Sequence, residues 1–233
     1  MNDWRFVIEE TGAGAAHMAR DMALASEGVA AVRFFRWEPP AVSTGWKQTR
    51  PAWLESAQWR RTGLDAVERP TGGGIAFHGS DVSISVVVPR ALDVPVATLL
   101  HAVCESAARL CETYGVKATV VDDMASSTRI TYCLTETSPY AVMIAQRKVA
   151  GFALRRYPES WLIQGSLLVR PFPEAMERAL PAEVVESVRR RAVSLAEASG
   201  ALLTEAAVAQ RWLDHWALWW EELLTQELGA SCP

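Results

Sequence analysis

The chain has few cysteines and no long apolar run, and each absence excludes a class of protein. Its four cysteines, Cys104, Cys111, Cys133 and Cys232, show no CxxC pair and no zinc-binding spacing, so free thiols are expected rather than disulfides or a metal site. No apolar stretch approaches the roughly 18 residues of a membrane span. The first residues also lack a basic segment followed by an apolar core, so no signal peptide is expected. These features predict a cytoplasmic protein.

An excess of positive charge is absent as well. The formal net charge is −4, which argues against a general basic surface for nucleic acid. Repeats, low-complexity tracts and linkers are also missing, while 50% of the 233 residues are hydrophobic and 21% are charged. Such a composition is normal for a globular protein with a sizeable core. We expect residues 1–233 to form a single monomeric domain that binds neither nucleic acid nor membranes.

The most unusual stretch is RPTGGGIAFHGSD at residues 69–81, where three consecutive glycines stand between Arg69 and His78. Glycine weakens regular elements and permits positive φ, so such a run marks a place where the backbone passes close to another group. Bare N–H groups with one arginine and one histidine can form a cradle for an acyl carbonyl or a phosphate. A glycine-rich hairpin is the alternative that these residues alone leave open.

The pattern of apolar residues predicts both helices and strands. Helices are expected at residues 13–27, 51–62, 95–114, 181–199 and 204–228, with Thr204 as a cap and Gly28, Gly115, Gly200 and Gly229 as stops. Strands are expected at 29–35, 41–48, 82–88, 117–121, 129–134, 140–145, 149–154 and 161–169, with a turn at 147–148. This succession predicts an α+β fold, in which a mostly antiparallel or mixed central sheet is flanked by helices.

Side chains that could bind a ligand lie on two of the predicted helices, and we expect both sets to pack instead. His101, Cys104 and Cys111 fall on or beside the apolar stripe of residues 95–114. The stripe of the last helix consists of Trp212, Trp216, Trp219 and Leu223 and is expected to pack on the sheet.

Four stretches carry the chemistry. They are RFFRWEPP at 33–40 with Ser43, Gly45 and Gln48; RPTGGGIAFH at 69–78 with Asp81; QRKVAGFA at 146–153; and QGSLL at 164–168. In this order they resemble the "RFY-W-PP-S-G-Q", "RRPTGGG…H…DL", "GRKIAGSA" and "HGSLLL" motifs of the lipoate–protein ligase A and octanoyltransferase family, the biotin/lipoate A/B protein ligase family. The resemblance spans about residues 4–170. It implies a biotin/lipoate ligase-like catalytic domain with a motif-bearing core at 1–170 and a helical C-terminal tail at 171–233.

The segment CLTETSPY at 133–140 resembles the "C-F-x-x-P-S-x-Y" segment of the cysteine-dependent octanoyltransferase branch. Ligases of the family commonly carry an Asn-Asp pair where this chain has Glu136 and Thr137. The resemblance therefore implies an acyltransferase of lipoate biosynthesis. It would move an octanoyl or lipoyl group from acyl carrier protein, through a thioester on Cys133, to a lysine of a lipoyl domain. Glycine cleavage H protein and a 2-oxoacid dehydrogenase E2 are such acceptors, and no cofactor is implied.

The chemistry of this transfer suits a cysteine beside a lysine. Thioester exchange needs a thiolate, and a nearby ammonium such as that of Lys148 lowers the pKa of a thiol from about 8.5. Lys148 can then deprotonate the incoming amine. Backbone N–H groups near Gly73 and Gly74, or near Lys148 and Val149, are candidates for holding the oxyanion. Outside the family context, a cysteine between two predicted strands is typical of an inert buried residue.

The resemblance also implies which residues shape the acyl pocket. One wall would consist of Trp37, Arg69, Thr71, Gly72, Gly73, Gly74 and His78. The opposite wall would consist of Gly151, Ala153, Gln164 and Gly165. Three positions depart from the family pattern: Glu68 replaces an arginine, Phe152 a serine and Gln164 a histidine.

Two other functions stay open. A lipoate–protein ligase would use ATP and Mg²⁺ to make a lipoyl-adenylate, with Cys133 as a structural residue and Lys148 in contact with the adenylate. A non-catalytic member of the family would only bind lipoyl domains or an acylated carrier protein. The three departures from the family pattern motivate this last alternative.

Overall fold

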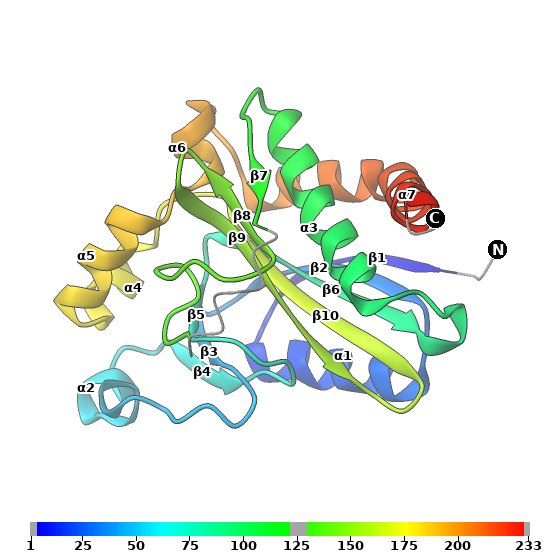
Figure 1. Ribbon diagram of the computed structural model, residues 1–233. Coiled ribbons are helices and arrows are strands. Elements are labelled where there is room, and N and C mark those ends of the chain that lie inside the picture. Colours follow the sequence, from blue (N-terminus) through cyan, green and yellow to red (C-terminus); the bar gives the residue numbers. More distant parts are fainter. Residues whose placement is uncertain (1–3, 122–129, 231–233) are drawn as a thin grey trace.

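A mixed seven-stranded sheet forms the centre of the computed structural model, which describes residues 4–121 and 130–230 (Figure 1). Neighbouring strands pair antiparallel except β1 and β2, which are parallel. The expected α+β fold with a mixed, mostly antiparallel sheet is therefore confirmed. In spatial order the strands are β1 (Arg5–Gly12), β2 (Ala31–Trp37), β6 (Asp81–Pro89), β10 (Ser160–Leu168), β9 (Arg147–Arg156), β8 (Ala141–Ile144) and β7 (Thr119–Val120).

A second sheet has three strands, in the order β4 (Asp65–Glu68), β3 (Ala41–Thr44) and β5 (Ala76–His78). β3 pairs parallel with β4 and antiparallel with β5. The glycine-rich residues connect β4 to β5, two strands that flank β3 and do not pair with each other. This stretch is therefore a connecting loop, and the glycine-rich hairpin is excluded.

Helices cover both faces of the large sheet (Figure 1). α3 (Val96–Glu112) and α7 (Glu205–Ala230) pack on the face to which β6 turns apolar residues such as Val82, Ile84 and Val86. α1 (Gly14–Glu27) lies on the other face, where Ser83 and Ser85 of β6 point. Successive side chains of a strand point to opposite faces, so β6 supplies both the core and a polar surface beside α1.

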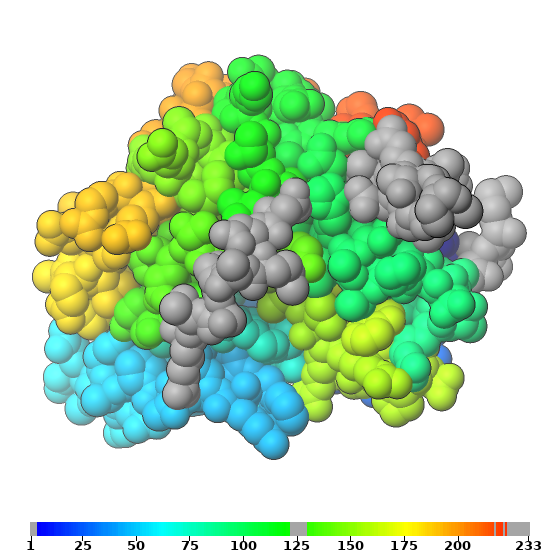
Figure 2. All heavy atoms as spheres, viewed as in Figure 1, coloured from blue at the N-terminus to red at the C-terminus, as the bar shows by residue number. Residues whose placement is uncertain are grey.

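The remaining helices are short: η1 (Ala52–Glu55), α2 (Ala57–Arg60), η2 (Arg90–Leu92), α4 (Glu174–Ala179), α5 (Ala182–Arg191) and α6 (Leu195–Ser199). Met176 of α4 and Val184 of α5 share an apolar cluster with Trp59 of α2. In the space-filling view, the gold surface of α4 and α5 accordingly lies against the cyan surface of the α2 region (Figure 2). None of the described helices is long and apolar enough to cross a membrane.

The expected helix ends and apolar stripes are largely confirmed. Gly28 adopts a φ of 67° at the end of α1, and the hydroxyl of Thr204 accepts a hydrogen bond from the N–H of Ala207 at the start of α7. The two cysteines of α3 are fully buried in the core, while His101 is half-buried. The stripe of α7 packs on the same core through Trp212, Trp216 and Trp219; the side chain of Leu223 lies outside the described part.

The predicted strand at 129–134 is wrong for the residues that the structure describes. Residues 130–139 form a loop that meets Ile75 in a single bridge at Tyr132. The carboxylate of Glu136 accepts hydrogen bonds from the N–H groups of Thr131 and Tyr132, at 2.8 and 3.0 Å. Because a side chain satisfies these backbone groups, the segment needs no neighbouring strand.

The single helix predicted at 181–199 is also wrong, because α5 ends at Arg191 and α6 begins at Leu195. Between them, the N–H of Val193 donates to the carbonyl of Lys148 at 3.0 Å. A backbone contact between segments distant in sequence thus breaks the helix, and helical periodicity does not reveal such a contact.

Smaller corrections concern boundaries. Residues 51–62 form η1 and α2 rather than one helix, and Gly229 lies inside α7. The turn expected at 147–148 lies at Ala145 and Gln146, which have φ values of 45° and 69°, so Lys148 belongs to β9. β1, β4, β5, η2 and α4 have no counterpart among the expected elements.

Replacing Trp212 with alanine is expected to destabilise the protein by about 3–5 kcal/mol, because a fully buried aromatic ring is lost. The ring packs against Phe34 with centroids 5.2 Å apart, and its Nε1 donates to the hydroxyl of Ser106. Urea unfolding followed by circular dichroism measures the effect. Leu218→Ala on the same helix, where 71% of the side chain is exposed, is the control and should cost less than about 0.5 kcal/mol. Equal losses from both substitutions would contradict this packing.

Candidate active site

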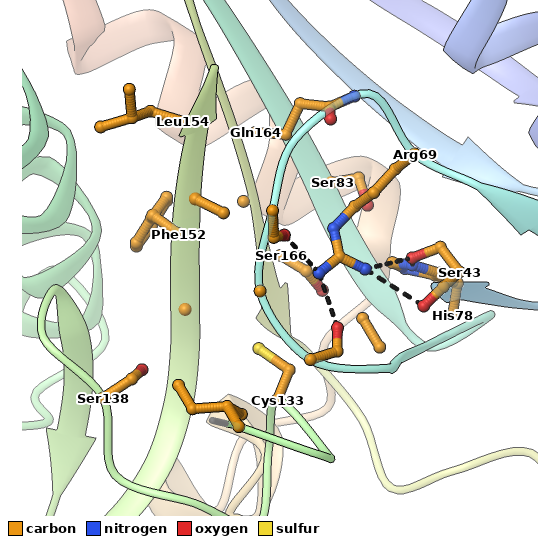
Figure 3. A pocket seen from close by; sticks show the side chains of 18 of the residues that line it. Ser43, Arg69, His78, Ser83, Cys133, Ser138, Phe152, Leu154, Gln164 and Ser166 are labelled. Atoms are coloured by element: carbon orange, nitrogen blue, oxygen red, sulfur yellow. Dashed lines mark hydrogen bonds between the residues drawn. The ribbon is translucent and has the colours of Figure 1, made fainter. Parts of the chain in front are cut away.

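A cavity of about 290 Å³ lies between the α1 face of the large sheet, the three-stranded sheet and the loop 130–139 (Figure 3). Most of the residues implied by the family resemblance come together in its lining: Trp37, Arg69, Gly72, Gly73, Gly74, His78, Cys133, Gly151, Ala153, Gln164 and Gly165. Thr71 and Lys148 are instead buried behind this lining. The sequence motifs therefore converge on one place, although they lie far apart along the chain.

The sulfur of Cys133 and the ammonium of Lys148 both lie close to Gly151. A Cβ atom placed on Gly151 would lie 3.0 Å from Cys133 Sγ and 3.2 Å from Lys148 Nζ. Nζ donates hydrogen bonds to the hydroxyl of Ser138 at 2.8 Å and to the carbonyl of Glu136 at 3.2 Å. Lys148 is 2% exposed, and both acceptors are uncharged. Glycine at 151 is what allows the two reactive groups to share this space.

An irregularity in β9 explains why the side chain of Lys148 lies on the same side of the strand as Gly151, a residue of the cavity lining. Val142 pairs with Ala150 and Met143 with Lys148, so the register shifts and Val149 has no opposite residue. In regular alternation, residues 148 and 151 would face opposite sides of the sheet. The extra residue places both on the same side, an effect typical of β-bulges beside functional sites.

Arg69 is a buried cation held by uncharged acceptors. Its Nη1 donates to the carbonyl and the hydroxyl of Ser43, both at 3.1 Å. Its Nη2 donates to the carbonyls of Gly72 at 2.8 Å and Gly74 at 2.6 Å, so the arginine shapes the glycine-rich loop around itself (Figure 3). Gly73 has a φ of 89°, which few other residues adopt. Burial lowers the pKa of Arg69, and the charge of Cys133 opposes this shift.

Asp81 forms the centre of a hydrogen-bond network behind the cavity. Its Oδ2 accepts from His78 Nδ1 at 2.8 Å and from the hydroxyls of Ser83 and Ser166 at 2.9 and 2.6 Å, while Oδ1 accepts from the N–H of Gly79 at 3.0 Å. Burial alone would raise the pKa of Asp81, but His78 and the other donors lower it overall. The carboxylate is therefore held in its charged form.

The network continues from Asp81 to the cavity wall. His78 Nε2 is 2.8 Å from the hydroxyl of Ser43, the residue that accepts hydrogen bonds from Arg69. The indole of Trp37 stacks on the His78 ring with centroids 4.0 Å apart and donates to the hydroxyl of Ser83 at 2.8 Å. The chain Asp81–His78–Ser43–Arg69 thus joins a buried anion to a buried cation.

Gln164 fits its surroundings although it departs from the family pattern. Its Oε1 accepts from the hydroxyl of Thr71, and its Nε2 donates to the carboxylate of Asp21 on α1, both at 2.7 Å. Asp21 is fully buried, and burial raises its pKa against the effect of its ion-pair partner Arg33. A glutamine can serve both neighbours at once because it donates and accepts without changing charge.

The other two departures are also accommodated. Phe152 lies opposite Gly165 in the β9–β10 pairing, and its ring covers the glycine so closely that a Cβ there would stand 2.0 Å from a ring carbon. The ring packs against the core under α3 and α7 and also lines the cavity. Glu68 is exposed at the end of β4 and does not line the cavity.

Several residues of the site were not predicted from the sequence. Ser83 and Ser166 bind the central carboxylate, Ser138 binds Lys148, and Asp21 holds Gln164. Ser83 carries a visible signal, since a serine interrupts the valine-rich run of β6. Ser138 lies within the CLTETSPY segment at 133–140, whereas Asp21 carries no such signal. Among the described residues, no group of His, Cys, Asp or Glu side chains could hold a metal ion.

Solved structures share this arrangement of helices and strands. A lipoate-protein ligase A bound with ATP has a TM-score of 0.69 at 18% identity, with 97% of this chain and 94% of that chain covered. A bi-partite lipoate protein ligase from Thermoplasma acidophilum, studied with its E2 lipoyl domain, has a TM-score of 0.65 at 17% identity, with 99% and 93% covered. The chain therefore has the catalytic fold of the lipoate ligases.

The sequence comparisons are more specific. The model of the lipoyl protein ligase A/B catalytic domain matches residues 16–217. An octanoyltransferase LipM from Symbiobacterium thermophilum is 30% identical over 85% of this chain and 79% of its own length. The chain belongs to the lipoyl protein ligase A/B catalytic domain family, as the motifs predicted.

Asp81→Asn is expected to lower the free energy of unfolding at pH 7 by roughly 2–3 kcal/mol, because a buried charged acceptor is lost. The folded-state pKa of Asp81 is lowered, so its contribution is full above the unfolded pKa of about 3.9 and is lost as pH falls through the folded value. The difference between wild type and variant should therefore shrink below about pH 4. Urea unfolding at pH 7, 5, 4 and 3 measures it.

The exposed Glu68→Gln, on the adjoining β4, is the matched control and should leave stability unchanged at pH 7. A difference for Asp81→Asn that stays constant down to pH 3 would show that the charge of Asp81 is not what stabilises the site.

Proposed function

We propose that this protein is an acyltransferase that moves an octanoyl or lipoyl group from acyl carrier protein to a lysine of a lipoyl domain. Cys133 is the nucleophile and Lys148 moves the protons. The observation that carries the proposal is that both side chains lie next to Gly151, a residue of the cavity wall. The similarity to curated octanoyltransferases supports the same reaction.

In the first step the Cys133 thiolate attacks the thioester carbonyl of the acylated carrier. The new carbon–sulfur bond forms at Cys133, and the bond to the carrier thiol breaks. Lys148 gives its proton to the departing carrier thiolate and becomes a neutral amine. Backbone N–H groups near Gly73 and Gly74, or near Lys148 and Val149, are the proposed donors to the oxyanion.

In the second step the amine of the lipoyl-domain lysine attacks the acyl-Cys133 carbonyl. Neutral Lys148 takes the proton of this amine as the amide forms, and Cys133 departs as a thiolate beside the restored ammonium. Thioester to amide transfer is downhill, so the reaction as proposed needs no ATP and no metal.

The cavity suits an acyl chain in its size and lining. Met18, Phe35, Trp37 and Leu154 supply apolar surface, and the polar groups gather near Cys133. An apolar pocket with a few placed polar groups is typical of small-ligand sites. We propose that the implied residues of both walls, including Thr71 through its bond to Gln164, form this acyl site. That the protein acts as a single-domain monomer stays a prediction.

The ATP-dependent ligase is the second candidate, favoured by the likeness to a lipoate-protein ligase A bound with ATP. That likeness, at 18% identity, is one of fold, whereas the Cys133–Lys148 approach is an observation on this chain. The non-catalytic alternative rested on three departures that the structure accommodates.

Incubation with octanoyl carrier protein is expected to add one octanoyl group to the protein, seen as an intact-mass increase that hydroxylamine removes. Cys133→Ala should abolish the adduct. Cys111→Ala is the control and should retain it, because burial raises the pKa of the Cys111 thiol to about 12. Transfer to a lipoyl domain that requires ATP and survives Cys133→Ala would establish the ligase instead. No transfer under either condition would favour the non-catalytic binder.

Gly151→Ala is expected to slow octanoyl transfer on the order of 100-fold, because a new methyl group separates Cys133 from Lys148. Single-turnover kinetics of lipoyl-domain acylation measures this loss, and an unchanged circular dichroism spectrum shows that the fold is retained. Full activity of the folded variant would mean that the two side chains need not meet above Gly151.

A further inference from the structure

Arg69 and Arg33 are both buried arginines, but they differ in their partners. Arg33 forms ion pairs with Asp21 and Glu9. Arg69 is 9% exposed, and among the described residues its guanidinium meets carbonyl and hydroxyl oxygens but no carboxylate. A buried charge without a counter-charge is costly, so its retention in the cavity wall calls for an anion.

The position of this cation is fixed by the network behind it. His78 Nδ1 donates to charged Asp81, and when the ring is neutral its Nε2 accepts the hydroxyl hydrogen of Ser43, 2.8 Å away. The Ser43 oxygen then accepts from Arg69 Nη1, while Nη2 is held by two carbonyls of the glycine-rich loop. The guanidinium is thus oriented before any substrate enters.

Cys133 is the group in the cavity that can supply the anion. Arg69 binds the carbonyl of Gly74, and the next residue, Ile75, accepts a hydrogen bond from the N–H of Cys133 at 2.8 Å. Both side chains line the cavity, as Figure 3 shows, and the charge of Cys133 acts on the pKa of Arg69. Among the described residues, Lys148 Nζ lies close to the same point above Gly151, and the carboxylate of Glu136 in the same loop is bound to the N–H groups of Thr131 and Tyr132.

We propose that Arg69 is a second catalytic cation, whose fixed guanidinium stabilises the Cys133 thiolate in the free enzyme and again when that thiolate departs from the acyl group. The inference rests on the proposed function. It assigns different tasks to the two cations. Lys148 gives its proton to the carrier thiolate in the first step, whereas an arginine guanidinium keeps its proton in proteins and so stays charged throughout. Of these two cations, Arg69 is then the one that keeps its charge in the acyl-enzyme.

The test measures the pH dependence of Cys133 alkylation by iodoacetamide, with the modified peptide quantified by mass spectrometry and no substrate present. Arg69→Gln is expected to move the midpoint upward by about one pH unit or more, since an opposite charge is removed. Arg69→Lys, which keeps the charge, should move the midpoint less. A midpoint unmoved by Arg69→Gln would overturn the proposal.

Arg155→Gln is the matched control. Arg155 also donates to this loop, at the carbonyl of Pro70, but its guanidinium lies over the ring of Trp46, 4.2 Å from the centroid. Its loss should leave the midpoint in place. An equal shift in both variants would show that the loop, rather than the charge of Arg69, governs the thiol.

A second measurement needs no change at Arg69, in case its variants fail to fold. In a Lys148→Met background, the stability of the protein relative to its Cys133→Ala derivative should rise with pH up to about 8.5, the pKa of an unfolded cysteine. The stability rises with pH because a thiol whose pKa is lowered in the folded state loses its proton there at a lower pH than in the unfolded chain. No rise would assign the thiolate to Lys148 alone and overturn the proposal.

The two hypotheses fail differently. If no octanoyl adduct forms in the wild type, the proposed function fails, while the alkylation midpoint still reports on Arg69. If the adduct forms and Arg69→Gln does not move the alkylation midpoint, the transferase stands and only the role of Arg69 is wrong.

Discussion

A charged carboxylate, that of Asp81, is kept away from water in the middle of the structure, and the site depends on how that charge is satisfied. Four donors surround it, from His78, Ser83, Ser166 and the backbone of Gly79. They come from β5, β6, β10 and the turn between β5 and β6, so a single anion ties the small sheet to the large one. Such a buried charge is stable because both oxygens of the carboxylate accept hydrogen bonds.

A chain of hydrogen bonds leads from this anion to the cavity wall. His78 and Ser43 connect Asp81 to Arg69, and the guanidinium of Arg69 fixes the glycine-rich loop by donating to two of its carbonyls. On the other side, an extra residue in β9 turns Lys148 to the face of Gly151. Within the described part of the chain, a thiol thus shares an apolar cavity wall with two cations whose hydrogen bonds go to uncharged oxygens, an arrangement suited to acyl transfer through a thioester.

The sequence revealed the elements whose signal is local. The strand at 82–88, the helix at 95–114 and the end of α1 at Gly28 follow from alternation, helical spacing and a residue suited to positive φ. The motifs also named most of the cavity lining. What escaped prediction depends on contacts between distant segments. Glu136 replaces a strand partner, Val193 binds Lys148 and splits a helix, and Asp21 of α1 binds Gln164 of β10; none of these contacts is visible in a periodic pattern.

The central claim is that an acyl group on Cys133 is an intermediate, and the direct measurement is a chase of the isolated acyl-enzyme. The protein is octanoylated, separated from carrier and nucleotide, and mixed with a lipoyl domain while the masses of both proteins are followed. The account predicts that the octanoyl group leaves the enzyme and appears on the lipoyl-domain lysine at the same rate, without ATP. An adduct that persists while the domain stays unmodified would contradict it.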